Sequence, residues 1–267
     1  MLPDFELIQH QFLGGHDINI IPIFDVHLGS QECQEQEFIS FIKTVSETPN
    51  TYLVLGGDLL DCGLKNSLTN VYRATMPPSQ QKREMANILE PVRDRILCLI
   101  PGNHERRSAR EADDCPIYDI ACKLDLENLY RENIAFLKIQ LGKESPGDYA
   151  INSDYRPLYS LIVIHGSGGG ILTGGAVNRS ERFGYVFSGE MDAMIVGHTH
   201  KPYTTQPGKI HIDLRNNKVS MKPFKVVSAT SWLDWGGYSA QKMLLPTSHC
   251  LNTITLSGFK KKLTVTM

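Results

Sequence analysis

Short runs of apolar, β-branched residues recur along the chain, and each ends abruptly at polar residues. Six of these runs are nearly continuous in apolar character: 18–24, 51–55, 95–100, 159–164, 193–196 and 224–229. A continuous apolar run of this length predicts a strand that is buried on both faces, since a strand with one wet face would alternate apolar and polar residues. The pattern therefore predicts sheets that are covered on both sides.

Helical periodicity separates the early runs. Residues 35–47, 79–94 and 113–131 carry apolar residues at three- and four-residue spacing, which predicts amphipathic helices. Asp113 or Asp114 is the predicted N-cap of the third helix, because a carboxylate there accepts hydrogen bonds from free backbone N–H groups. Alternation of strand and helix predicts βαβ units in the N-terminal half.

The C-terminal half has a different pattern. Residues 209–223 and 251–267 alternate around Asn- and Gly-containing turn signals, which predicts two β-hairpins. Neither a low-complexity linker nor an internal repeat divides the chain. We therefore expect a single α/β (α+β) domain over residues 1–267, with two sheets packed face to face and helices outside.

Composition narrows the class of protein further. Of the 267 residues, 41% are hydrophobic and 21% are charged, as in ordinary globular proteins. The net charge of −2 gives no global basic field that would attract nucleic acid. The six cysteines form no CxxC pair, and neither a signal peptide nor a membrane span is recognisable. These features predict a cytoplasmic protein without membrane association.

Five predicted strands end in residues that commonly bind metal ions. These residues are Asp25, His27, Asp58, Asn103, His165, His198 and His200. Ligands of α/β sheets bind at the carboxyl ends of strands, so we expect these side chains to meet at one edge. Imidazole with carboxylate suits manganese, iron, zinc or nickel better than calcium. Seven ligands are too many for one ion and fit two divalent ions, with Asp58 as the bridging carboxylate that relieves their repulsion.

Five sequence blocks in this order resemble the calcineurin-like metallophosphoesterases over about residues 18–235. The blocks are Asp25-x-His27, Gly57-Asp58-x-x-Asp61, Gly102-Asn103-His104-Glu105, His165, and Gly197-His198-x-His200. The resemblance implies a four-layer αββα sandwich of two mixed β-sheets flanked by helices. It also implies one metal ion on Asp25, His27, Asp58 and His200, and a second on Asp58, Asn103, His165 and His198.

The resemblance further implies catalytic roles for His104 and Asp61. His104 would protonate the leaving group, and Asp61 would orient His104, since a carboxylate beside an imidazole fixes its tautomer and favours its charged form. We expect a metal-bridging hydroxide to attack phosphorus. The expected cofactors are two divalent ions, Mn²⁺ first, with Fe, Zn or Ni as alternatives.

The substrate class stays open at this point. Cys62 follows Asp61 where protein phosphatases of the family carry Arg, and the wording of the blocks is nearest to SbcD-type nucleases and to bacterial or phage phosphodiesterases. We therefore expect a phosphodiesterase, with a nucleotide or nucleic acid as substrate. The alternatives are a phosphomonoesterase acting on a metabolite or phosphoprotein, and a metal-bound interaction scaffold.

Three arginines near the blocks are candidate substrate ligands. Arg106 and Arg107 would grip phosphate through their guanidinium groups, although a solvated loop would also explain them. Arg179 lies after the glycine-rich stretch 166–175, which we expect to be a loop that cradles the substrate. Residues 107–143 are long enough to form a helical cap over the site.

Overall fold

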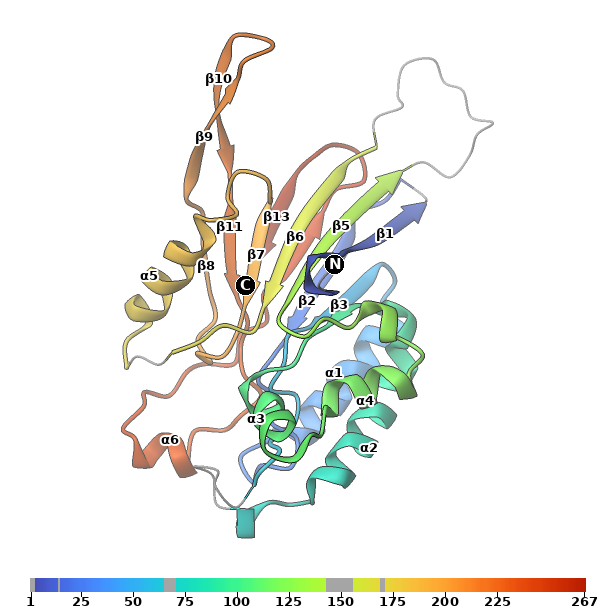
Figure 1. The fold of residues 1–267 in the computed structure, drawn as a ribbon, viewed down its shortest axis with the longest axis vertical. Helices are drawn as coiled ribbons and strands as arrows, with labels where there is room; N and C mark the ends of the chain where they lie inside the picture. The colour runs from blue at the N-terminus through green and yellow to red at the C-terminus, as the bar shows by residue number, and fades with distance from the viewer. Residues whose placement is uncertain (1–2, 14, 65–70, 143–155, 169–170) are drawn as a thin grey trace.

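Two large mixed β-sheets form the centre of the molecule in the computed structural model, which describes residues 3–13, 15–64, 71–142, 156–168 and 171–267 (Figure 1). The six-stranded sheet has the order β1 (Leu7–Leu13), β5 (Ile134–Gly142), β6 (Leu158–Ile164), β7 (Ala193–Val196), β11 (Lys225–Ser228) and β8 (Tyr203–Thr205). The five-stranded sheet has the order β13 (Leu263–Thr266), β12 (Thr253–Leu256), β2 (Ile18–Ile23), β3 (Thr51–Leu55) and β4 (Ile96–Leu99). Within the sheets, β2, β3 and β4 run parallel, as do β6, β7 and β11.

The apolar runs bury alternate residues in two different cores. In β3, Val54 joins the core between the two sheets, while Leu53 and Leu55 pack on the opposite face against helices. Those helices are α1 (Glu35–Glu47), α2 (Pro78–Leu89) and α4 (Pro116–Lys123). Burial on both faces explains why the run 51–55 shows no polar alternation.

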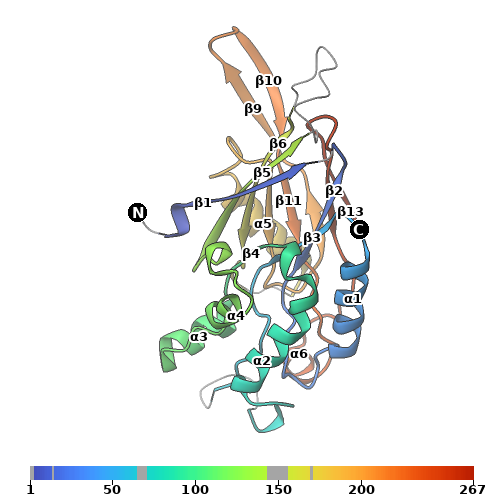
Figure 2. The ribbon, with the colours of Figure 1, turned by 90° about the vertical axis from the view of Figure 1, so that its right-hand side faces the viewer.

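The six-stranded sheet is covered in the same way. Leu161 of β6 faces the five-stranded sheet, whereas Ile162 packs on the outer face with Ala176 of α5 (Thr173–Gly184). Helices, sheet, sheet and helix therefore make four layers, which confirms the predicted αββα sandwich. The hairpin of β9 (Gly208–Asp213) and β10 (Lys218–Pro223) projects beyond these layers in both views (Figure 1, Figure 2).

Most predicted elements are present, with shifted ends. The helix at 35–47 and both hairpins are confirmed, since β9 pairs with β10 and β12 with β13. The helix predicted from 79 ends at Leu89 and continues as a 3-10 turn, Glu90–Arg95. The predicted N-cap of the third helix was wrong. Asp113 adopts a left-handed conformation that closes α3 (Asn103–Ala112), and Cys115 precedes α4 instead.

Several elements were not predicted. The strands β1, β5 and β8 were missed, as were the short helix α6 (Gly237–Gln241) and the 3-10 turns Pro3–Phe5, Val71–Arg73 and Glu127–Leu129. The glycine-rich stretch is a loop only in part, because α5 begins at Thr173 and includes Gly174 and Gly175; Gly169 and Gly170 lie outside the described residues.

The segment 107–143 is divided among four elements rather than forming one cap. Its described residues include the end of α3, α4, the 3-10 turn Glu127–Leu129 and β5, and residue 143 lies outside the described part. Helix α4 packs in the outer helical layer and β5 is an interior strand of the six-stranded sheet, so neither covers the site. Of the elements in this segment, α3 stands beside the carboxyl ends of the strands (Figure 1).

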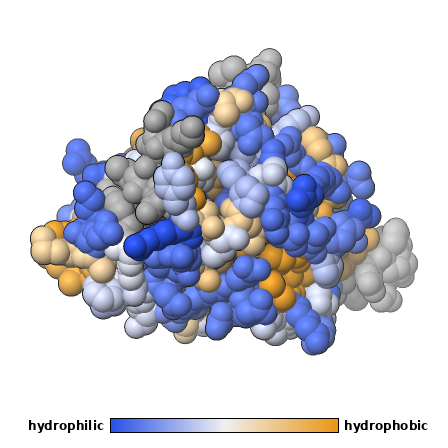
Figure 3. All heavy atoms as spheres, turned by 90° about the horizontal axis from the view of Figure 1, so that it is seen from below, coloured by the Kyte–Doolittle hydropathy of each residue, from blue (hydrophilic) through white to orange (hydrophobic). Residues whose placement is uncertain are grey.

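The carboxyl ends of β2, β3 and β4 meet those of β6 and β7 at one edge of the sandwich, at the bottom of Figure 1. Seen from below, this side of the molecule is mostly hydrophilic, with hydrophobic side chains in small separate patches (Figure 3). No helix in the described ranges is long and apolar enough to span a membrane.

Candidate metal centre

The strand ends gather two groups of side chains that could each hold a metal ion. The first consists of Asp25, His27 and His200, and the second of Asp58, His165 and His198. In each group one ligand atom per residue lies within 4.8 Å of the others. A third combination, His27, Asp58 and His104, also meets this distance.

The first group surrounds a buried carboxylate oxygen. Asp25 Oδ1 lies 3.5 Å from His200 Nε2, and His27 Nε2 lies 3.4 Å from the same nitrogen. The other oxygen, Oδ2, accepts a hydrogen bond of 2.8 Å from the backbone N–H of His198. Asp25 Oδ1 is buried, and no hydrogen-bond donor reaches it from the described residues. A buried acceptor without a donor is costly unless a cation compensates it.

The second group also brings buried acceptor atoms close together. The Nδ1–H of His165 donates to the carbonyl of Gly56 at 2.9 Å, so its Nε2 carries the lone pair in the neutral ring. This Nε2 faces three further acceptors: Asp58 Oδ2 at 3.3 Å, Asn103 Oδ1 at 3.1 Å and His198 Nδ1 at 3.3 Å. With the His165 ring neutral, these four atoms are all acceptors, and acceptors that converge in this way fit a bound cation.

Charge in this cluster is balanced by protons when no metal is bound. Burial raises the pKa of Asp58, but the neighbouring His165 lowers it well below its usual value, so the carboxylate is ionised. Burial lowers the pKa of His165, but the carboxylates of Asp58 and Asp25 raise it to about 9. Metal binding at neutral pH would therefore displace a proton from His165.

Backbone strain is concentrated at the same residues. Eleven non-glycine residues of the described part have positive φ, and five of them are predicted ligands: Asp25 (52°), His27 (51°), Asp58 (51°), His198 (66°) and His200 (56°). This region of backbone space disfavours residues with a Cβ, and such strain clusters at functional sites. The fold thus holds these ligands in conformations that their sequences alone would not prefer.

Three ligands are directly preceded by a glycine, and these glycines allow close packing of neighbouring atoms more than they allow sharp turns. Of the glycines directly before Asp58, Asn103 and His198, Gly57 alone has a positive φ, 91°, while Gly102 has φ −91°. A Cβ on Gly102 would meet Asp58, and one on Gly197 would meet the ring of Phe24. A positive-φ turn directly before one of these three ligands therefore occurs at Gly57, whereas Gly102 and Gly197 leave room for their neighbours.

His104 lies beside the first group, on α3. Its ring is 4.5 Å from that of His27, centroid to centroid. Its Nδ1 lies 2.7 Å from the backbone carbonyl of Asp61 and 3.5 Å from the Asp61 carboxylate. The closest orienting group is thus the carbonyl, which accepts Nδ1–H and leaves Nε2 free for chemistry. The predicted partnership is present, but its shortest contact is to the backbone rather than to the side chain.

Glu105 is a site residue to which the sequence assigned no role. Its carboxylate is completely buried and accepts three backbone N–H groups, those of Asp58 (2.9 Å), Leu60 (3.0 Å) and Gly102 (2.8 Å). Burial raises the pKa of Glu105, and the nearby Asp58 carboxylate raises it further. Glu105 ties the loop of Asp58 to the loop of Asn103, which a sequence motif alone does not reveal.

Replacing Glu105 by Gln should weaken metal binding about 10- to 100-fold, since residues that hold ligands in place typically contribute that much. The amide NH₂ would face a backbone N–H in place of an accepting oxygen, which should cost about 1–3 kcal/mol of folding stability. Calorimetric titration with Mn²⁺ and urea unfolding measure the two effects. Glu111→Gln on the same helix, where Glu111 pairs with Arg110 at the surface, is the control. Unchanged metal affinity in Glu105→Gln would contradict this role.

The three predicted substrate arginines occupy different places. Arg107 donates to the carbonyl of Asp61 at 3.4 Å, beside His104. Arg106 points to the other side of α3 and contacts the carbonyls of Glu132 and Asn133, both at 3.4 Å. Arg179, on α5, donates to the carbonyl of Ser167 at 2.9 Å. Arg106 and Arg179 line one pocket, and Arg107 does not.

Comparisons with known proteins agree with this geometry. The family model described as calcineurin-like phosphoesterase matches residues 23–202, about two thirds of the chain and all of the predicted ligands. The search of curated proteins found no match.

Three solved structures are distant matches. A predicted phosphoesterase from Streptococcus pneumoniae TIGR4 is 9% identical, with 94% of this chain and 98% of that chain covered and a TM-score of 0.36. A metallophosphoesterase from Sphaerobacter thermophilus is 13% identical, with 94% and 89% covered and a TM-score of 0.38. The NAD nucleotidase of Haemophilus influenzae is 11% identical, with 94% and 49% covered and a TM-score of 0.40. Because these scores are low, the family assignment depends on the sequence match.

Proposed function

The chain belongs to the calcineurin-like phosphoesterase family, and from this premise we propose that it hydrolyses phosphodiesters with two divalent metal ions held at the edge of the sandwich. As a member of this family it is a metal-dependent phosphoesterase. The observation that carries the two-ion proposal is the pair of acceptor clusters, which share Asp58 between them through its contacts to His165 and, at 3.9 Å, to His27.

These contacts support the assignment of the ligands to two ions. One ion would be held by Asp25, His27, Asp58 and His200, and the other by Asp58, Asn103, His165 and His198. The donors are nitrogen and oxygen only, which supports Mn²⁺, with Fe, Zn or Ni as alternatives. Bound ions of this kind supply Lewis acidity and a nucleophilic water at neutral pH.

The residues of the chain supply the proton and the orientation. His104 donates Nδ1–H to the carbonyl of Asp61, so Nε2 is the nitrogen that can deliver a proton to the leaving oxygen. The Asp61 carboxylate lies 3.5 Å from Nδ1 and helps to hold the ring in this orientation. Arg107, next to both residues, would draw a phosphoryl oxygen toward this side.

A small diester, such as a cyclic nucleotide, is the proposed substrate, in preference to nucleic acid, because a net charge of −2 gives the chain no general attraction to a polyanion. A reducing cytoplasm is the proposed location, supported by six free cysteines.

The decisive experiment compares a diester with a monoester. Protein stripped of metal and reloaded with Mn²⁺ is given bis-p-nitrophenyl phosphate and p-nitrophenyl phosphate under the same conditions. We expect no turnover without metal and a higher kcat/KM for the diester after reloading. A higher kcat/KM for the monoester would replace the proposal by a phosphomonoesterase.

A further inference from the structure

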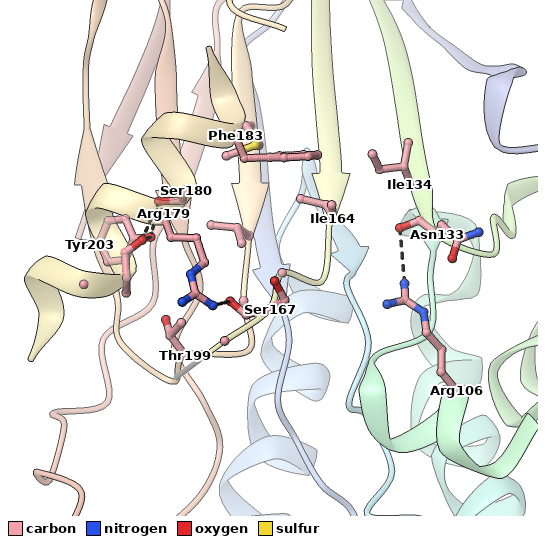
Figure 4. Close-up of a pocket in the computed structure, with 17 residues that line it drawn as sticks. Arg106, Asn133, Ile134, Ile164, Ser167, Arg179, Ser180, Phe183, Thr199 and Tyr203 are labelled. Atoms are coloured by element: carbon pink, nitrogen blue, oxygen red, sulfur yellow. Dashed lines mark hydrogen bonds between the residues drawn. The ribbon is translucent and has the colours of Figure 1, made fainter. Parts of the chain in front are cut away.

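A pocket of about 340 Å³ opens beside the candidate metal centre, between α3, α5 and the ends of β6 and β7 (Figure 4). Its walls are largely apolar and comprise Ile134, Ile164, Phe183, Met194 and Val196. Arg106 and Arg179 stand on opposite sides of it (Figure 4). A volume of this size with apolar walls and few polar groups is typical of a small-molecule site.

The pocket adjoins the second ligand group. Gly166, which lines it, directly follows His165, and the lining residues Gly197 and Thr199 flank His198. His104 lies on the other side of the centre, where its ring packs against that of His27. The position proposed for the leaving oxygen and the pocket are therefore on different sides of the metal cluster.

Helix α3 separates the two sides. His104 turns toward Asp61, while Arg106, two residues later, turns toward Asn133 and the pocket. Positions two apart on a helix differ by about 200° in direction, so one helix can serve both sides. A phosphorus centre at the metals would thus place one ester group at His104 and another toward the pocket.

We propose that this pocket holds the organic group that remains on phosphorus after cleavage, and that this group presents a flat ring to the apolar walls. The inference rests on the proposed phosphodiesterase function and deepens it, since a monoester has no second organic group to place there. Hydrolysis breaks the bond between phosphorus and the leaving oxygen, water supplies the new oxygen, and the retained group leaves as a phosphomonoester.

Phe183 is the residue that favours a flat group. Its ring is 40% exposed and lies over the pocket together with Ile164 and Ile134 (Figure 4). Exposed aromatic rings gain by stacking against another ring, in addition to the apolar area that is buried. A phenyl ring or a nucleobase satisfies this requirement, whereas a methyl group would leave most of the pocket empty.

Arg179 is held at the edge of the pocket by the neighbouring loop. It donates to the Ser167 carbonyl, and its guanidinium occupies the space that a Cβ on Gly168 would need. Gly168 also has a φ of 81°, which suits glycine. The charge of Arg179 is thereby placed where it can pair with a phosphoryl oxygen or with the polar edge of the retained group.

The test uses two diesters with the same leaving group, methyl p-nitrophenyl phosphate and phenyl p-nitrophenyl phosphate, and the Mn²⁺-loaded full chain. The quantity compared is the phenyl-to-methyl ratio of kcat/KM, because dividing each variant's ratio by that of the parent cancels the intrinsic reactivity of the esters. Phe183→Ala should lower this ratio roughly 5- to 20-fold, as expected for loss of one stacking contact and its buried area.

A second variant fills the pocket. A Cβ on Gly175 meets nothing within 4 Å, so Gly175→Leu should fold and should lower kcat/KM for the phenyl ester much more than for the methyl ester. Tyr185→Ala is the matched control, since Tyr185 follows α5, is 56% exposed and does not line the pocket.

The outcomes are distinct. A ratio that falls in Phe183→Ala and Gly175→Leu, but not in Tyr185→Ala, supports the inference. Turnover of both esters with the same ratio in all variants would overturn the pocket's role while leaving the phosphodiesterase in place. Absence of turnover of either ester by the metal-loaded parent protein would overturn the proposed function and the pocket's role with it.

Discussion

Asp58→Asn should abolish tight binding of both metal ions and lower the rate of diester hydrolysis roughly 1,000-fold or more. The proposed ions share this carboxylate, and bound metal ions supply several kcal/mol of transition-state stabilisation, at about 1.4 kcal/mol for each tenfold in rate. The substitution keeps the shape of the side chain, and an amide oxygen can still accept the His104 backbone N–H that Asp58 Oδ1 now accepts at 2.8 Å. The effect would therefore reflect lost charge rather than lost fold.

Metal content per chain and kcat/KM measured on the same preparation check this prediction. Asp94→Asn is the control, because Asp94 is 90% exposed and lies on the turn before β4. A variant that keeps two ions and near-normal activity would remove Asp58 from the bridging position. Loss of only one ion would show that Asp58 binds a single ion and that the two metal sites do not share a ligand.

The sequence could predict that these candidate ligands would lie together, because the signal for each one is local to its own strand. The runs that end at Asp25, Asp58 and His165 are buried on both faces, and parallel strands bring their carboxyl ends to the same edge. Once two sheets of parallel strands are expected, the polar residues that follow the strands must lie at the shared edge formed by the carboxyl ends. This prediction therefore required no knowledge of contacts between residues distant in the sequence.

What the sequence missed depends on contacts between distant segments. Glu105 reads as one more polar residue of a helix, and its role appears only when the loops of Asp58 and Gly102 converge on it. The start of helix α5 fell in the predicted loop 166–175, because Gly174 and Gly175 weaken helix propensity. Packing of Ala176 against the outer face of the six-stranded sheet outweighs that preference.

The misassigned cap has a similar cause. Strand β5 follows two helical patterns without a long apolar run, since Lys138 and Gln140 interrupt it, and alternation over 134–142 was not recognised as a strand. Its alternating burial fits a strand whose one face lies in the core between the sheets, through Ala135, Leu137 and Ile139. The period of two was present in the sequence and was attributed to the wrong element.

His104→Ala should retain both metal ions and lose about 100- to 10,000-fold in rate on diesters with a poor leaving group, the usual contribution of a general acid. The loss should shrink toward a few-fold for p-nitrophenyl esters, because p-nitrophenolate departs without a proton. This dependence on the leaving group separates proton donation from other roles. His211→Ala, on the projecting strand β9, is the control and should change neither metal content nor rate.

In this test, the metal content of His104→Ala distinguishes a metal ligand from a general acid most directly. His104 also lies within ligand distance of His27 and Asp58, so the geometry alone would allow it to bind an ion. Its Nδ1, however, is engaged by the Asp61 carbonyl, and His27 and Asp58 already have partners in the two ligand groups. Loss of one metal ion in His104→Ala, with equal loss of rate for good and poor leaving groups, would make His104 a ligand instead of an acid. If His104→Ala retains both metal ions and its loss of rate grows as the leaving group becomes poorer, His104 is the residue that protonates the leaving group.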